Sequence, residues 1–232
     1  MKRILVLFLF LVQSSFVFAS DQVAIERAPI DLSNQPSLQK GARTFINYCL
    51  NCHSAKYMRY NKLLDIGLSK KEIKKNLLFT GNKIGDPMEI SMQTEESKKW
   101  FGATPPDLSV VARSRGSDWI YSYMKGFYRD NSREIGWNNV VYVNSAMPHI
   151  LWELQGEQGL DKETGKLITN KPGKLNQKEY DSVITDLTNF ITYMSEPNQL
   201  KRKKIGFYVI GFLLVLLLLT INLKKEFWKD IK

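Results

Sequence analysis

The segment that decides the fold reads YCLNCHS and spans residues 48–54. It contains both cysteines of the chain, Cys49 and Cys52, followed directly by His53. The pattern Cys-x-x-Cys-His is the attachment signature of haem c. Two thiols three residues apart lie within about one helical turn, so both can bond to one porphyrin edge. We therefore predict one covalent haem c on Cys49 and Cys52, with His53 as an axial iron ligand.

Other uses of the cysteine pair fit the sequence less well. A redox motif of the thioredoxin kind would need a βαβ pattern, which the surrounding residues do not have. A zinc site would need further Cys or His ligands, and His149 is the one histidine outside the motif. A disulfide-linked structural domain without haem stays open, and a haem stain on a denaturing gel would exclude it.

The second axial ligand is predicted from the methionines. Met147 lies in NSAMPH, residues 144–149, where Pro148 fixes φ and favours an extended loop that can present sulfur to iron. A methionine ligand raises the haem potential, which suits electron transfer. Met194 is expected in the core, and Met58 is too close to the motif. A lone methionine is often a filler of the core, and His149 is the rival ligand, unless it is an ordinary surface histidine.

The two ends of the chain read as export and membrane segments. Lys2 and Arg3 precede nine apolar residues, 4–12, and small residues lie before position 20, so residues 1–19 are predicted to be a signal peptide. The alternative is an uncleaved anchor. Residues 205–223 have no charge and would span about 28 Å as a helix, which predicts a transmembrane helix rather than a buried core helix.

Charge supports this arrangement. The chain has 33 Lys and Arg against 23 Asp and Glu, but ten of the bases and two of the acids lie in residues 1–3 and 201–232. Residues 4–200 therefore have a net charge of +2, and the excess suits membrane lipid and not nucleic acid. The export signal places residues 20–199 outside the cytoplasm and leaves residues 224–232 as a cytoplasmic tail.

The extracytoplasmic part is predicted to be mainly α, a c-type cytochrome domain with loop insertions, plus the one C-terminal transmembrane helix. Predicted helices run from residue 36 or 37 into the cysteine motif, over 117–128, and from the capping pair Asn176 and Glu179 to Pro197. Residues 56–75 read as helical turns broken at Gly67, and 80–106 read as loop. Residues 155–176 read as a surface excursion of unknown role, with a hairpin turn around 170–173.

Four segments, in this order, make the chain resemble the cytochrome c1 family of the bacterial kind, the haem subunit of the cytochrome bc1 (ubiquinol:cytochrome c oxidoreductase) complex. They are YCLNCHS with YMRYNKL at 57–63, TPPDLS at 104–109 with Arg113 and Arg115, AMP at 146–148 with LWELQG at 151–156, and DLTNFITYMSEP at 186–197 before the basic run and anchor. Together they cover most of the chain.

The resemblance implies His53 and Met147 as the axial pair, and Pro105 and Pro106 as part of the haem pocket wall. It also implies that one arginine, Arg115 more than Arg113, meets a haem propionate. Trp119 stands where the family often has tyrosine, which puts in doubt the contact of a hydroxyl at this position with the propionate. His149 stands where many members have a second proline. For both arginines the alternative is solvated surface charge.

The implied function is respiratory electron transport. The chain would take one electron from the Rieske iron–sulfur protein and pass it to a cytochrome c, beside cytochrome b, as a single-pass protein of the inner membrane with its haem domain in the periplasm. With both axial positions filled, it would be an electron carrier and no enzyme by itself. The alternatives are a free-standing membrane-anchored cytochrome c that feeds a terminal oxidase or reductase, and a haem sensor or enzyme with an open sixth site.

Overall fold

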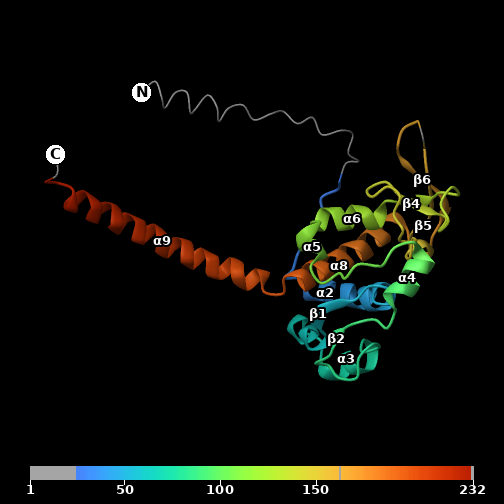
Figure 1. Cartoon of the computed structure of the whole chain (residues 1–232), viewed down its shortest axis with the longest axis horizontal. Coiled ribbons are helices and arrows are strands. Elements are labelled where there is room, and N and C mark those ends of the chain that lie inside the picture. Colours follow the sequence, from blue (N-terminus) through green and yellow to red (C-terminus); the bar gives the residue numbers. More distant parts are fainter. Residues whose placement is uncertain (1–24, 162, 231–232) are drawn as a thin grey trace.

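Two packed helices form the centre of the fold in a computed structural model that describes residues 25–161 and 163–230 (Figure 1). They are α2 (Gln35–Thr44) and α8 (Gln177–Ser195). A Cβ at Gly41 would lie 2.0 Å from the backbone oxygen of Asp186, so the two helices approach too closely for a side chain there. The rings of Phe45 and Phe190 continue the contact at 5.6 Å. The predicted signal peptide lies outside the described residues.

Both predicted helices of this pair are confirmed. The Asn34 side chain accepts a hydrogen bond from the Ser37 amide at the start of α2, which then runs on as a π-helical turn, Phe45–Cys49, into the cysteine motif. Asn176 and Glu179 form the predicted capping box at the start of α8. Because one face of α8 is buried along its length, the support for the cysteine motif comes from the core of the protein.

The segment after the motif departs from the prediction in its first residues. Ala55–Arg59 is a strand, β1, paired antiparallel with β2 (Pro87–Met88), and not a helical turn. Its amides find partners far along the chain: Lys56 N donates to Asp107 and Tyr57 N to Ser109. A 3₁₀ helix, Tyr60–Ile66, and α3 (Lys70–Asn76) follow, and Gly67 at φ 88° breaks them apart as predicted.

The middle of the chain contains one helix that the prediction of a loop over 80–106 missed. This is α4 (Thr94–Phe101), whose first turn is acidic and whose last turn is basic, as the helix dipole favours. Next come α5 (Val111–Ser114), α6 (Ser117–Lys125) and the antiparallel pair β3 (Phe127–Arg129) and β4 (Trp137–Asn139). The helix predicted over 117–128 therefore ends at Lys125, and a strand takes its last residues.

The predicted surface excursion is a hairpin with its turn elsewhere. After the short helix α7 (Trp152–Gln155), β5 (Gly156–Leu160) pairs with β6 (Leu167–Pro172). Residues 170–172, where the turn was predicted, lie within β6. The turn lies at residues 161 and 163–166 instead, where the Asp161 side chain accepts a hydrogen bond from the Glu163 amide and Gly165 takes φ 68°.

The chain ends in a long apolar helix, α9 (Gln199–Phe227), which projects away from the other elements (Figure 1). Among the described residues it is the one helix long and apolar enough to cross a membrane, with a mean hydropathy of 2.4 over an 18-residue window. Its large apolar side chains are exposed. The apolar helix is confirmed, while the boundaries 20–199, 205–223 and 224–232 stay predictions. The described chain is mainly helical, as predicted, with three small two-stranded sheets.

Candidate haem site

The two cysteines lie at the end of the helix that α8 supports. The amides of Cys52 and His53 both donate to the Cys49 carbonyl, at 3.0 and 2.9 Å, which closes a tight turn around the motif. Both cysteines are free thiols. Burial raises the pKa of Cys49 to about 12, with the Cys52 charge adding to the shift, and burial also raises the pKa of Cys52. Both sulfurs are therefore available for thioether bonds.

His53 is oriented by the backbone of another segment. Its Nδ1 lies 2.7 Å from the Pro106 carbonyl oxygen, so Nδ1 carries the proton and donates it. Burial lowers the pKa of His53, while the Pro106 hydrogen bond and the Asp107 charge oppose that shift. A neutral imidazole with Nδ1 engaged offers the Nε2 lone pair to a metal, and such a carbonyl partner is typical of a ligand histidine.

The segment that carries Pro105 and Pro106 is fastened along the motif. The Leu108 amide donates to the Ser54 carbonyl at 2.8 Å, and the Asp107 side chain accepts hydrogen bonds from the amides of Lys56 and Ser109. Pro105 is half-buried and Pro106 is exposed. The structure therefore brings this segment, which the resemblance assigned to the pocket wall, directly beside His53.

Met147 lies half-buried in a loop and packs against the same hydrophobic core as Cys49. Its amide donates to Ser145 Oγ at 3.2 Å, and that hydroxyl is 2.7 Å from the Tyr123 hydroxyl of α6. Asn144, which starts the loop, has φ 61°, a left-handed conformation that asparagine tolerates better than most residues. The structure thus has a loop at Met147, as predicted, while Met147 as the iron ligand stays a prediction.

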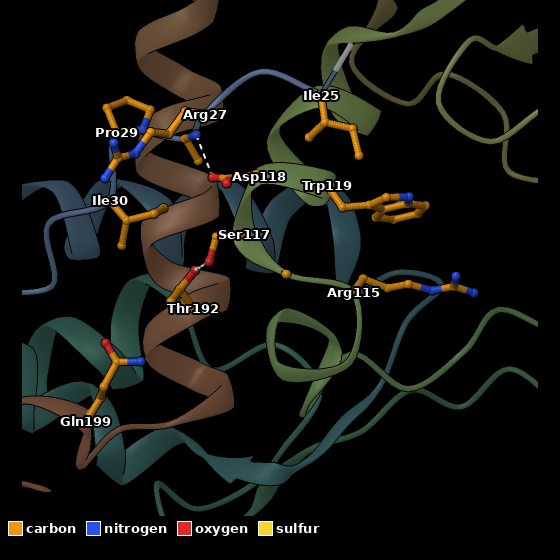
Figure 2. A pocket seen from close by; sticks show the side chains of 12 residues that line it. Ile25, Arg27, Pro29, Ile30, Arg115, Ser117, Asp118, Trp119, Thr192 and Gln199 are labelled. Carbon is orange, nitrogen blue, oxygen red and sulfur yellow. Dashed lines mark hydrogen bonds between the residues drawn. The ribbon is translucent and has the colours of Figure 1, made fainter. Parts of the chain in front are cut away.

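Arg115 and Trp119 lie together, and Arg113 lies apart from them. The Arg115 guanidinium is 5.3 Å from the Trp119 ring centroid, and Figure 2 shows both side chains on the same side of their turn. They line part of an open pocket of about 730 Å³. Arg113 is exposed, and its charge acts instead on Glu196, whose pKa is lowered first by the Arg202 hydrogen bond. Arg115 is exposed as well, so the assignment of either arginine to a propionate stays a prediction.

The turn that carries Arg115 and Trp119 is held at its base. Asp118 accepts a hydrogen bond from the Ala28 amide at 2.8 Å, and the hydroxyls of Ser117 and Thr192 are 2.9 Å apart (Figure 2). The Trp119 ring stacks on Tyr123 with centroids 4.8 Å apart. This stack links the turn with the loop of Met147.

His149 is a correction to the expectation of a surface histidine. Its side chain is buried, with 2% of it exposed, and the ring stacks on Phe127. Burial lowers the pKa of His149 to about 4, an effect that a Gln155 interaction opposes and the Arg129 charge reinforces. The ring is therefore neutral at physiological pH.

Together these residues fit a haem c. This group needs two thiols, a neutral histidine and apolar surroundings. Cys49 and Cys52 are free thiols, and His53 is neutral with its Nδ1 engaged. Met147 lies in the apolar neighbourhood. Sequence reasoning missed the residues that fix the Met147 loop, foremost Tyr123 and Ser145. Tyr123 lies in the helix predicted over 117–128, but its hydroxyl partner Ser145 is 22 residues away and leaves no local signal.

Comparisons with known proteins show which family this chain is similar to. The Cytochrome C1 family profile matches residues 26–231. The chain is 46% identical to a protein of Nitrosomonas europaea called ammonia monooxygenase gamma subunit, across 100% of both chains. It is 44% identical to cytochrome c1 of Allochromatium vinosum, across 99% of both. A solved chain of a hyperthermophilic respiratory Complex III is 16% identical and has a TM-score of 0.46, covering 100% of this chain and 96% of that one.

Proposed function

Because the chain belongs to the cytochrome c1 family, we propose that it is the haem subunit of a ubiquinol:cytochrome c oxidoreductase, the bc1 complex. In this role it takes one electron from the Rieske iron–sulfur protein and passes it to a cytochrome c. The observation that supports the proposal most is the hydrogen bond from His53 Nδ1 to the Pro106 carbonyl, because it prepares Nε2 as an iron ligand beside two free thiols.

When bound, a haem supplies one-electron redox chemistry. Cys49 and Cys52 would hold it through thioether bonds, and His53 and Met147 would be the two protein ligands of the iron. Pro105 and Pro106 would form part of the pocket wall, and Arg115 with Trp119 would be the partner for a propionate. With both iron ligands supplied by protein, no site would stay open for a substrate, so the chain by itself would carry electrons and make no bonds.

The membrane arrangement follows from the two ends of the chain. The exposed apolar surface of α9 suits lipid and the neighbouring cytochrome b, and this helix is the single anchor in the inner membrane. The residues 1–19 direct the haem domain to the periplasm, where the Rieske protein and cytochrome c meet it. Within α9, basic side chains at 201–204 and at 224–225 flank the apolar segment 205–223, where they meet lipid headgroups.

Two other roles stay as candidates to be tested. The Nitrosomonas europaea relative is named as a subunit of ammonia monooxygenase, whereas the Allochromatium vinosum relative is named cytochrome c1. A free-standing membrane-anchored cytochrome c would have the same haem residues. Purification of the tagged full-length chain from its own membranes separates these roles. Co-purification of cytochrome b and the Rieske protein supports the bc1 role, and their absence with another oxidoreductase present contradicts it.

The axial pair is tested with Met147→Leu in membranes. We expect the haem to stay attached, the weak far-red sulfur-to-iron charge-transfer band of the ferric form to disappear, and quinol-to-cytochrome c turnover to collapse as the potential falls. The matched control is Met194→Leu, because Met194 is buried in the core, and its band should not change. An unchanged band in Met147→Leu would assign the ligand to another residue.

A further inference from the structure

His149 is a buried histidine without a role in the function proposed above. Both ring nitrogens are buried, and the polar group that acts on them is the Gln155 side chain, whose Oε1 is buried as well. The contacts of well-defined geometry are made by the faces and edges of the ring, which stacks on Phe127 and meets Trp137. His149 is two residues from Met147, with Pro148 between them, so its position limits where Met147 can lie.

Two aromatic side chains fix the plane of the His149 ring. The ring stacks on Phe127 with centroids 4.9 Å apart and planes 8° apart. It meets the edge of Trp137 at 5.1 Å and 81°. The other partner of Trp137 is the Arg129 guanidinium, 3.9 Å from the ring centroid. The histidine therefore belongs to a continuous aromatic stack that spans strands β3 and β4.

The base of the β5–β6 hairpin holds this stack in place. Gln158 Nε2 donates to the Phe127 carbonyl at 2.8 Å and to the Lys125 carbonyl at 3.0 Å, and Gln155 Nε2 donates to the same Lys125 carbonyl. Glu157 accepts hydrogen bonds from the Arg129 guanidinium at 3.1 and 3.2 Å. The hairpin thus contacts β3, the strand that carries Phe127. The segment 155–176, which contains this hairpin, therefore supports the candidate site.

The other side of Met147 is fixed by the same aromatic series. Ser145 lies 2.7 Å from the Tyr123 hydroxyl, and the Tyr123 ring meets Phe127 at 5.0 Å. The Asn144 amide donates to the Asn138 side chain of β4. Ser145 and His149 are each two residues from Met147, so one connected set of side chains holds the loop at both ends.

We propose that His149 is a positioning residue that holds Met147 at the haem iron through the stack on Phe127 and Trp137, with the β5–β6 hairpin as its support. The inference rests on the proposed function, because it requires Met147 to be the ligand. A planar ring of similar size at position 149 does the work, and a side chain without a ring does not.

The test compares four variants of the full-length chain in membranes: His149→Phe, His149→Leu, His149→Ala and Met147→Leu. The readouts are the far-red band of the ferric haem and the midpoint potential from a redox titration, normalised to haem stain on a denaturing gel. We expect His149→Phe to keep the band of the wild type. We expect His149→Leu and His149→Ala to lose at least half of it, with a lower potential and unchanged haem stain.

The outcomes separate the two proposals. A band that survives in Met147→Leu contradicts the ligand assignment of the proposed function. If Met147→Leu loses the band while His149→Ala keeps it, the positioning role is wrong and the ligand assignment stands. A loss in His149→Phe equal to that in His149→Ala would assign the role to the ring nitrogens and overturn the proposal. Failure of the Leu and Ala variants to accumulate, beside a normal Phe variant, overturns it too, because the ring would then serve the whole fold.

Discussion

Residues 45–53 continue a helix that α8 supports along its length, whereas residues 144–149 form a loop whose support comes from three separate elements. The first region places its thiols by local backbone hydrogen bonds within the motif, and only the ring of His53 takes a partner from elsewhere, the Pro106 carbonyl. The second places Met147 by side chains of α6, β3 and β4. One side of the candidate site is therefore encoded locally, and the other depends on tertiary contacts.

The difference suggests a division of tasks. Covalent attachment tolerates little variation in the spacing of the thiols, and a helix end with a tight turn supplies that spacing rigidly. A methionine ligand forms one weak bond, whose strength depends on how well the loop is held in advance. Changes near the motif should therefore act on attachment and folding, and changes near the loop on ligation.

The largest effect should come from the motif itself. We expect the double variant Cys49→Ala and Cys52→Ala to lose all covalent haem, because the chain has no other thiol. Haem stain after denaturing electrophoresis measures this, with Met147→Leu as the matched control that keeps its stain. Equal haem stain in the two variants would contradict the view that the motif controls attachment and the Met147 loop does not.

A smaller effect should follow from the helix pair under the motif. In Gly41→Ala the new Cβ would lie 2.0 Å from the Asp186 oxygen, so α2 and α8 must separate, and we expect a loss of about 3 kcal/mol in the free energy of unfolding. Denaturant unfolding of the holoprotein in detergent measures it. Gly85→Ala is the control, since its Cβ meets nothing within 4 Å, and it should change stability by less than about 0.5 kcal/mol.

On the loop side, the hydroxyl pair of Tyr123 and Ser145 should contribute less. Tyr123→Phe removes one partner of the Ser145 hydroxyl, and Ser145→Ala removes the partner of both the Tyr123 hydroxyl and the Met147 amide. We expect each to lower the free energy of unfolding by about 1–2 kcal/mol. A double-mutant cycle should give a coupling of about 1 kcal/mol, and the far-red band should weaken with it. Additive losses with an unchanged band would mean that this pair does not hold the loop.

The smallest effect should be a dependence on pH at Asp107, beside His53. Burial raises the pKa of Asp107, but hydrogen bonds from Ser109 and the Lys56 amide outweigh it and hold the pKa below its ordinary value of 3.8. Since a lowered pKa stabilises the fold above the unfolded value, this contribution is full above pH 3.8 and is lost as the pH falls below it. Asp107→Asn should therefore be less stable than the wild type at pH 6, with the gap closing below pH 3.8. A gap that stays constant with pH would contradict this.

The same contrast explains which parts of the fold could be predicted. The helix into Cys49, the capping box at Asn176 and the apolar α9 follow from neighbouring residues, and each was predicted. The strand at Ala55–Arg59 was missed because its amides pair with residues about 50 positions away. The hairpin turn was misplaced because Pro172 and Gly173 look like a turn, while Asp161 and Gly165 form it.

The candidate site divides in the same way. Cys49, Cys52 and His53 were identified from their pattern, and Met147 from its proline neighbour and the resemblance. The preference for Arg115 over Arg113 came from the resemblance, and the structure adds the contact of Arg115 with Trp119. The burial of His149 depends on Phe127 and Trp137, which no local pattern around position 149 indicates.

Glu196, Pro197 and Asn198 are the whole connection between α8 and α9. Three residues can span at most about 10 Å even when fully extended, and the pair of Arg202 with Glu196 shortens the connection further. A body tethered so tightly cannot swing toward a distant donor and then toward an acceptor. The rate of electron transfer through it must therefore be set by the arrival and departure of its partners. This rate should respond to their concentration and charge more than to any bending of the connection between α8 and α9.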